Sequence, residues 1–164
     1  MKGDIAIRFA RAEDAGLILA LVRELARYER APGAVVATEA DLVRHGFGRE
    51  RAFEALLASL DGEPVGFALF YPVFSTWLGR PGMFLEDLYV REVARRRGVG
   101  RALLARLAAI AVERGYGRLH FNVLTWNPAK GFYERLGMEP RAQWQGYGAG
   151  EQVLRHLAQE DRGQ

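Results

Sequence analysis

The chain has 164 residues, of which 49% are hydrophobic and 26% are charged, and it contains no cysteine. This length fits one domain with a substantial core, and the hydrophobic content excludes an intrinsically disordered chain. The absence of cysteine excludes a disulfide framework, a thiolate nucleophile and a Cys-ligated metal centre. The three histidines are scattered, so we expect no metal site. Charges interrupt every apolar run before the roughly 18 residues that a membrane span needs, and the first residues lack a signal-peptide core. We therefore expect a cytoplasmic protein that binds no membrane.

The basic residues are almost all arginine. The net charge is +3, and the 23 basic residues comprise two lysines and 21 arginines. Arginine forms bidentate contacts with phosphate and carboxylate, which suggests an anionic ligand, but GC-rich coding or adaptation to heat accounts better for most of the excess. One cluster stands apart, Arg95–Arg97 with Arg91 and Arg101 on either side. Nucleic-acid binding requires clustered basic side chains without compensating acidic ones, so we expect no nucleic-acid partner.

The first half of the chain predicts a strand, two helices and a hairpin. Residues 4–9 alternate as a short strand does, and apolar residues at helical spacing predict a helix over 13–29. The sequence Thr38-Glu39-Ala40-Asp41 resembles a capping box and predicts a second short helix that ends at Gly46. Strands at 52–60 and 65–71 flank the turn signal Asp61-Gly62-Glu63.

The second half predicts a strand–helix–strand unit and a short C-terminal part. We expect a loop at 72–81 that contains Trp77, a strand at 83–90, a long amphipathic helix at 98–114 and a strand at 119–124. A right-handed crossover through the helix makes the two strands parallel. Beyond them we expect a helix at 128–136 ended by Gly137, a weak strand at 144–148 and a helix at 151–159. The elements together predict a single domain, residues 1–164, of mixed α/β class.

The junction between the expected strand 83–90 and the expected helix 98–114 is suited to bind an anion. It reads Arg95-Arg96-Arg97-Gly98-Val99-Gly100-Arg101. The glycines allow the backbone to approach a ligand, and the unpaired N–H groups at a helix start attract negative charge. The junction lacks the third glycine of a dinucleotide fingerprint and the Lys-Ser/Thr of a P-loop. A tight turn is the simpler alternative, but the flanking strand and helix favour a pyrophosphate site.

This junction resembles the Gln/Arg-x-x-Gly-x-Gly/Ala signature of the GCN5-related N-acetyltransferases (GNAT). The segment 126–138, Trp-Asn-Pro-Ala-Lys-Gly-Phe-Tyr-Glu-Arg-Leu-Gly-Met, resembles a second motif of that family, and the resemblance spans essentially the whole chain. Segments 23–29, 38–48 and 84–90 resemble the diamine (spermidine/spermine) acetyltransferase branch, which includes relatives that acetylate thialysine. The resemblance implies the GNAT acyl-CoA N-acyltransferase fold, a mixed and mostly antiparallel sheet flanked by helices, and a homodimer.

The resemblance also implies acetyl-CoA as co-substrate and assigns the residues that bind it. Backbone groups at 88–90 would contact the acetyl carbonyl and the pantetheine arm, and the 95–101 turn would contact the pyrophosphate. The expected cofactor-binding residues are Leu88, Tyr89, Val90, Arg95, Arg96, Arg97, Gly98, Val99, Gly100, Arg101 and Asn127. From Asn127 to Tyr133 there are six positions where the family pattern has seven, which weakens the assignment of Asn127.

Glu86 and Asp87 lie in an otherwise apolar strand. Because successive strand residues face opposite sides, we expect one carboxylate to point toward the core or cleft and the other away. A carboxylate in such a strand needs a partner, so a salt bridge to an arginine is the structural alternative to a catalytic role. By resemblance, Glu86 accepts the proton of the amine and also contacts it, and Asp87 is a second candidate for cation binding.

Three aromatic or acidic residues complete the expected site. By resemblance, Tyr133 is the general acid that protonates the departing thiolate, although a lone tyrosine is usually a packing residue. Tyr28 and Glu29 match a pair that lines the amine site in the diamine branch, and a solvated helix end is the alternative. That branch has an acid near its C-terminus where this chain reads Gln143-Trp144-Gln145-Gly146-Tyr147. This difference and the net positive charge weaken a polyamine assignment.

The sequence thus predicts direct acetyl transfer from acetyl-CoA to a primary amine of a small molecule in a ternary complex. A diamine, a polyamine and a lysine-like amino acid all remain possible acceptors. The alternatives are acetylation of a protein N-terminus or lysine, and a non-catalytic acyl-CoA-binding module.

Overall fold

A computed structural model describes residues 3–161 of the chain. Two compact units are present, Met1–Leu124 and Thr125–Gln164. Among the described residues, the first unit contains all the strands and the longest helices, and the second contains two helices. Within residues 3–161 no helix combines the length and the hydropathy that crossing a membrane would require.

The first unit is built on one sheet of five strands in the order β1-β2-β3-β4-β5. The strands are β1 (Ile5–Phe9), β2 (Glu54–Leu60), β3 (Glu63–Ser75), β4 (Arg80–Val90) and β5 (Leu119–His120). Neighbouring strands are antiparallel except β4 and β5, which are parallel. The mixed, mostly antiparallel sheet and the parallel pairing across the long helix are therefore confirmed.

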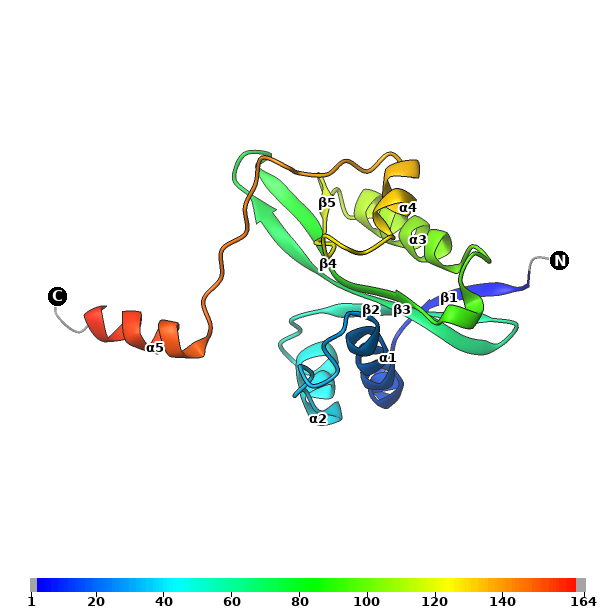
Figure 1. Ribbon diagram of the computed structural model, residues 1–164, viewed down its shortest axis with the longest axis horizontal. Coiled ribbons are helices and arrows are strands. Elements are labelled where there is room, and N and C mark those ends of the chain that lie inside the picture. The colour runs from blue at the N-terminus through cyan, green and yellow to red at the C-terminus, as the bar shows by residue number, and fades with distance from the viewer. Residues whose placement is uncertain (1–2, 162–164) are drawn as a thin grey trace. The chain divides into compact units, whose positions relative to one another are not determined.

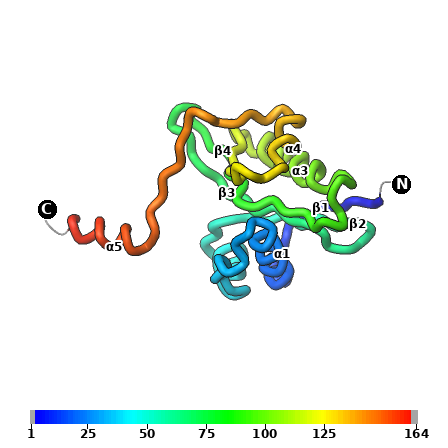
Figure 2. Tube along the Cα trace, in the orientation of Figure 1, coloured from blue at the N-terminus to red at the C-terminus, as the bar shows by residue number. Residues whose placement is uncertain are grey.

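Helices cover both faces of this sheet. The first-unit helices are α1 (Ala15–Tyr28), α2 (Glu39–Leu42) and α3 (Val99–Glu113), and short turns of other helical types lie at Ala12–Asp14, Val43–Phe47 and Glu92–Ala94. Helix α1 lies on one face and α3 on the opposite face (Figure 1). Figure 2 shows the same layering along the Cα trace. On the α1 face, Ile18, Leu21 and Leu25 pack in one buried cluster with Phe67 and Leu69. The apolar stripes that predicted both helices are thus their core faces.

Local signals are confirmed at two further points. The Thr38 hydroxyl accepts a hydrogen bond from the backbone N–H of Asp41, and the Asp41 carboxylate accepts one from the N–H of Thr38 at 2.8 Å, which forms the expected capping box. Asp61 and Gly62 both have positive φ, 53° and 86°. Two consecutive residues of this kind form the hairpin turn whose twist matches paired strands.

The prediction of a loop at 72–81 is wrong. Strand β3 continues to Ser75 and β4 begins at Arg80, so a four-residue turn joins them. Pro72 suggested the end of the strand, because proline cannot donate a hydrogen bond to a neighbouring strand. It pairs with Met83, whose N–H points to the other side of β4 and donates to Arg118 O at 2.8 Å. In such a pair neither N–H faces the partner strand, so proline removes no bond between β3 and β4.

Two more expected strands differ from the structure. Strand β5 ends at His120, four residues before the expected end at 124. Residues 144–148 form no strand, because Gly146 and Gly148 disfavour an extended, packed conformation.

The second unit contains α4 (Lys130–Arg135) and α5 (Glu151–Glu160), both close to their expected positions. Gly137 follows the C-cap residue of α4, Leu136, and has a φ of 82°, and the N–H of Met138 donates to Tyr133 O at 3.2 Å. A left-handed glycine with this return bond is a common helix C-terminus. The expected stop at Gly137 is confirmed.

Candidate active site

Strand β4 contains one more residue than β3 across the same stretch of ladder. Leu69 pairs with Asp87 and Phe70 pairs with Leu85, so no residue of β3 lies opposite Glu86 in the strand pairing. Such a β-bulge shifts the phase of every later residue by one position, both for side chains and for backbone groups.

The bulge places both carboxylates of β4 on the α1 face. Glu86 accepts a hydrogen bond of 2.8 Å from the hydroxyl of Tyr71, which packs against the α1 core cluster. Asp87 pairs with Leu69, which belongs to that cluster. The expectation that Glu86 and Asp87 point to opposite sides is therefore wrong, because the simple alternation holds only in a regular strand.

The two carboxylates differ in their surroundings. Glu86 is exposed, whereas Asp87 is largely shielded from solvent. Burial raises the pKa of Asp87 to about 6, and the negative charges of Glu86 and of Glu29 add to this effect. Glu29 caps the C-terminal end of α1, next to Tyr28. The carboxylates of Glu86 and Glu29 therefore lie near that of Asp87, and a cationic group bound among the three would relieve their mutual repulsion.

The first half of β4 uses its outer edge to pair with β5. Met83 N–H donates to Arg118 O, and the parallel pairing then covers Met83 and Phe84. Within residues 3–161, no strand pairs with this edge beyond Phe84. Pairing thus stops shortly before the bulge at Glu86.

The bulge also decides which backbone groups face that unpaired edge. Arg91 N–H donates to Val65 O of β3 at 2.8 Å, so by alternation the N–H of Tyr89 also faces β3. Leu88 and Val90 then direct their N–H and C=O groups to the open edge. Three residues were expected to contact the acetyl donor through their backbone groups. The backbone groups of Leu88 and Val90 face the open edge, as this contact requires, whereas those of Tyr89 face β3.

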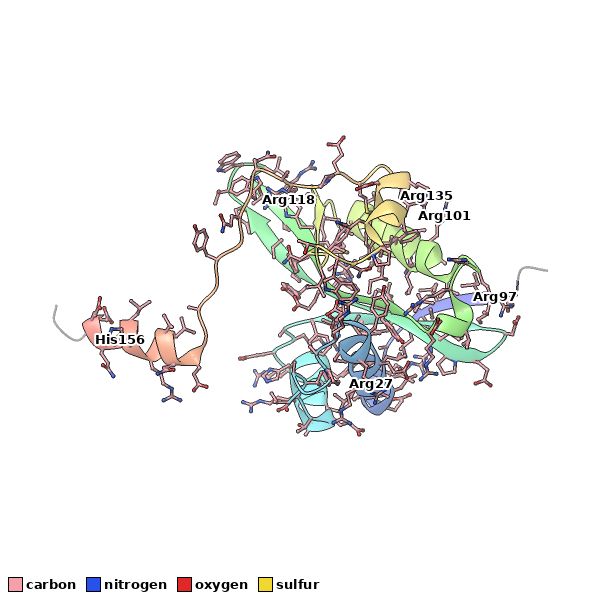
Figure 3. All side chains as sticks on the ribbon, viewed as in Figure 1. Arg27, Arg97, Arg101, Arg118, Arg135 and His156 are labelled. Carbon is pink, nitrogen blue, oxygen red and sulfur yellow. The ribbon has the colours of Figure 1, made fainter. Side chains whose placement is uncertain are left out.

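The start of α3 presents unpaired backbone donors. Arg96 and Gly98 have φ of 61° and 93°, and no side chain caps the helix. The first intrahelical bond runs from Ala102 N to Gly98 O, which leaves the N–H groups at 99–101 without an acceptor in the helix. Arg97 and Arg101 carry their guanidinium groups at the surface around this end of the helix (Figure 3). This geometry suits a phosphate or diphosphate.

Two arginines of the cluster serve inside the protein. Arg91 binds the Glu24 carboxylate through Nε and Nη2, with a shortest distance of 2.8 Å, and donates through Nη1 to Pro64 O. Arg95 Nε donates to Val90 O at 2.9 Å, and its guanidinium lies over the ring of Tyr28 at 4.6 Å from the ring centre. The side chain of Arg95 therefore belongs to the α1 face, and its backbone N–H donates to Glu92 O at 3.1 Å, so both its side chain and its N–H are bonded within the protein.

Arg97 has a looser partner. Its Nη2 atom lies 3.4 Å from Oδ2 of Asp61, and both side chains are well exposed. Asp61 also accepts a hydrogen bond from Asp4 N at 2.8 Å. A long, exposed ion pair of this kind contributes little to stability, so Arg97 can turn toward an anionic ligand at small cost.

The comparisons with known proteins decide the family. The sequence model of the acetyltransferase (GNAT) family matches residues 16–138. The chain belongs to this family. It is an acetyl-CoA-dependent N-acetyltransferase.

Several relatives and solved structures resemble this acetyltransferase along most of its length. It is 34% identical to the thialysine N-epsilon-acetyltransferase of Sus scrofa over 94% of this chain and 97% of the relative, and 37% identical to that of Bos taurus over 87% and 89%. It is 38% identical to the spermidine/spermine N(1)-acetyltransferase-like protein 1 of Homo sapiens over 75% of this chain and 19% of the relative. The resemblance to the diamine and thialysine branch is thereby confirmed. An integron cassette protein from the mobile metagenome of V. cholerae has a similar structure, with a TM-score of 0.78 and 25% identity over 96% of this chain and 98% of the other.

The residues of this acetyltransferase fit acetyl-CoA at two points. The start of α3 offers N–H groups to a diphosphate. The open edge of β4 offers the N–H and C=O groups of Leu88 and the N–H of Val90 to the amides of an extended pantetheine arm, as an added strand would use them. The carboxylates of Glu86 and Asp87 leave the same strand on the α1 face.

The second unit holds the remaining expected residues. Tyr133 lies on α4, and its ring centre is 5.2 Å from that of Phe132. The Asn127 side chain accepts a hydrogen bond from Ala129 N at 2.9 Å and so forms the turn that leads into α4. Asn127 thus has a structural task in addition to any contact with the cofactor.

Sequence reasoning missed Tyr71. The available signal was a hydroxyl group at the end of an expected strand, 65–71, whose other residues are apolar or glycine. Its significance depends on the register between β3 and β4, which places Tyr71 opposite Phe84 and diagonal to Glu86.

Asp87→Asn should change stability in a pH-dependent way. The pKa of Asp87, about 6 in the folded protein, exceeds the value of about 3.9 expected when unfolded, so the folded state binds more protons between these pH values. Stability therefore falls as pH rises from about 4 to 6 and stays lower above that. The asparagine variant should be more stable than the wild type at pH 8, by up to about 3 kcal/mol, and about equally stable at pH 4. Urea unfolding at both pH values measures this, and an equal effect at the two values would contradict the burial of a charged Asp87.

Proposed function

We propose that this acetyltransferase modifies the terminal primary amine of a small, lysine-like amino acid or short diamine. The convergence of Glu86, Asp87 and Glu29 on the α1 face carries this proposal, because three neighbouring carboxylates favour a compact cationic acceptor. The thialysine N-epsilon-acetyltransferases, which match most of the chain, support the lysine-like acceptor.

The acceptor amine must lose its proton before it attacks. Glu86 is the proposed general base, which takes this proton directly or through water. Asp87 and Glu29 bind the remaining positive charge of the acceptor, and Tyr28 lines the same region beside Glu29. A second ammonium or an α-amino group on the acceptor explains why more than one carboxylate is present.

The β4 edge and the α3 start are proposed to hold the acetyl donor. Acetyl-CoA supplies the activated acetyl group as a thioester. Backbone N–H groups of Leu88 and Val90 donate hydrogen bonds to the acyl carbonyl and to the arm, and the N–H groups of the 98–101 turn bind the diphosphate. Arg96, Arg97 and Arg101 add positive charge around this turn.

Tyr133 is the proposed general acid, which donates a proton to the leaving sulfur. The chain contains no cysteine, so no acetyl-cysteine can form and transfer is direct within a ternary complex. The family match runs from residue 16 to 138 and includes both Glu86 and Tyr133, which supports a single acetyltransferase domain over residues 1–164.

A long polyamine is the less favoured acceptor. Residues 143–147 contain no acid, and the net charge of +3 opposes the approach of a long polycation. We also propose a cytoplasmic homodimer. The cysteine-free composition is compatible with a reducing compartment, and the resemblance to the diamine branch implies the dimer.

An acceptor panel tests the proposed substrate class. With acetyl-CoA held constant, release of free CoA is followed for thialysine, lysine, ornithine, a short diamine, spermidine and a peptide with a free N-terminus. We expect the highest kcat/KM for one of the first four compounds, at least tenfold above spermidine and the peptide. A preference for spermidine would assign the polyamine function instead. Preference for the peptide, or no release with any amine, would contradict the proposal.

Tyr133→Phe should lower kcat by about 10²–10⁴-fold, the usual contribution of a positioned acid, and leave the Kd of acetyl-CoA nearly unchanged. Steady-state kinetics and calorimetric titration with acetyl-CoA measure the two quantities. Tyr147→Phe is the matched control, because Tyr147 is 92% exposed in the same unit, and it should affect neither. Equal loss of turnover and acetyl-CoA binding in Tyr133→Phe would identify Tyr133 as a binding or packing residue.

A further inference from the structure

Tyr71 contacts the proposed base directly. Its hydroxyl donates a hydrogen bond to Oε2 of Glu86, with an O–O distance of 2.8 Å. The two residues are on adjacent strands, and Tyr71 pairs with Phe84, two positions before Glu86. The contact is thus a diagonal one across the strands, which long side chains can make.

The ring of Tyr71 is held in place from two sides. It stacks on Phe84 with ring centres 5.4 Å apart and an interplanar angle of 24°, and it packs against the core cluster under α1. The position of the hydroxyl is therefore set by the core. Glu86 is exposed and would otherwise distribute over several rotamers, since a free glutamate side chain has high conformational entropy.

The hydroxyl remains a donor throughout the pH range in which the enzyme can work. Burial raises the pKa of Tyr71 to about 12, and its hydrogen bond to Glu86 and the nearby charges of Glu86 and Asp87 act in the same direction. A neutral phenol that donates to one carboxylate oxygen leaves the other oxygen available as an acceptor.

We propose that Tyr71 is a positioning residue, whose hydroxyl orients the carboxylate of Glu86 so that Oε1 faces the acceptor amine. This inference rests on the proposed role of Glu86 as the general base. Tyr71 itself neither gives nor takes a proton in the reaction. It fixes the direction in which Glu86 takes one, and a misdirected base loses much of its effect.

Tyr71→Phe removes the hydroxyl and keeps the ring that stacks on Phe84. We expect kcat to fall about tenfold or more, while the KM and Kd of acetyl-CoA change less than twofold, because the donor site on the β4 edge is untouched. Tyr116→Phe is the matched control. It removes a hydroxyl from the segment just after α3, where the backbone N–H of Tyr116 bonds Ala111 O, and should leave kcat unchanged. Thermal unfolding of each variant confirms that it is folded.

The decisive measurement combines this change with Glu86→Gln in a double-mutant cycle. If Tyr71 acts through Glu86, Tyr71→Phe lowers kcat in the wild type and has little further effect in the Glu86→Gln background. An equal fold loss in both backgrounds, or no loss of kcat in the wild type, would overturn the positioning role while leaving Glu86 as the base. Wild-type turnover of Glu86→Gln alone would overturn the base and this inference together.

Discussion

The extra residue in β4 is the constraint on which the candidate site depends. Without a bulge at Glu86, Asp87 would share the face of Leu85 and point toward α3, and the backbone groups of Tyr89 would face the outer edge. With it, both carboxylates leave the strand on the α1 face, and Leu88 and Val90 present their backbone groups at the edge. The bulge thus separates two parts of the site. The side chains on the α1 face would contact the acetyl acceptor, and the backbone groups at the edge of β4 would contact the acetyl donor.

The arginine cluster divides in a similar way. Arg91 and Arg95 join α1, β3 and the end of β4 through Glu24, Pro64, Tyr28 and Val90. These contacts stabilise the junction that leads into α3. Arg96, Arg97 and Arg101 are exposed around unpaired N–H groups and remain available to an anion. The charge composition of the chain therefore reflects structure as much as ligand binding, and the backbone of the turn contributes as much to the anion site as its side chains do.

Most of the fold could be predicted because its signals are local. The stripe of Leu21 and Leu25, the capping box at Thr38 and the Asp61-Gly62 turn each lie within a few residues of the structure they determine. The sequence signals for the turn at 95–101 and for the end of α4 near Gly137 are equally local. The bulge at Glu86 could not be predicted, since it depends on how β3 and β4 align over a long hairpin. Pro72 hid the length of that hairpin, and with it the contact between Tyr71 and Glu86.

Hydrogen exchange at two neighbouring amides tests the bulge and its role most directly. The register pairs the Tyr89 N–H with β3, so it should exchange slowly with or without acetyl-CoA. The Leu88 N–H faces the open edge, so it should exchange fast in the free enzyme and become protected when acetyl-CoA is added. A Leu88 amide that is already as protected as that of Tyr89 in the free enzyme, or protection by acetyl-CoA that falls on Tyr89 instead, would contradict the account.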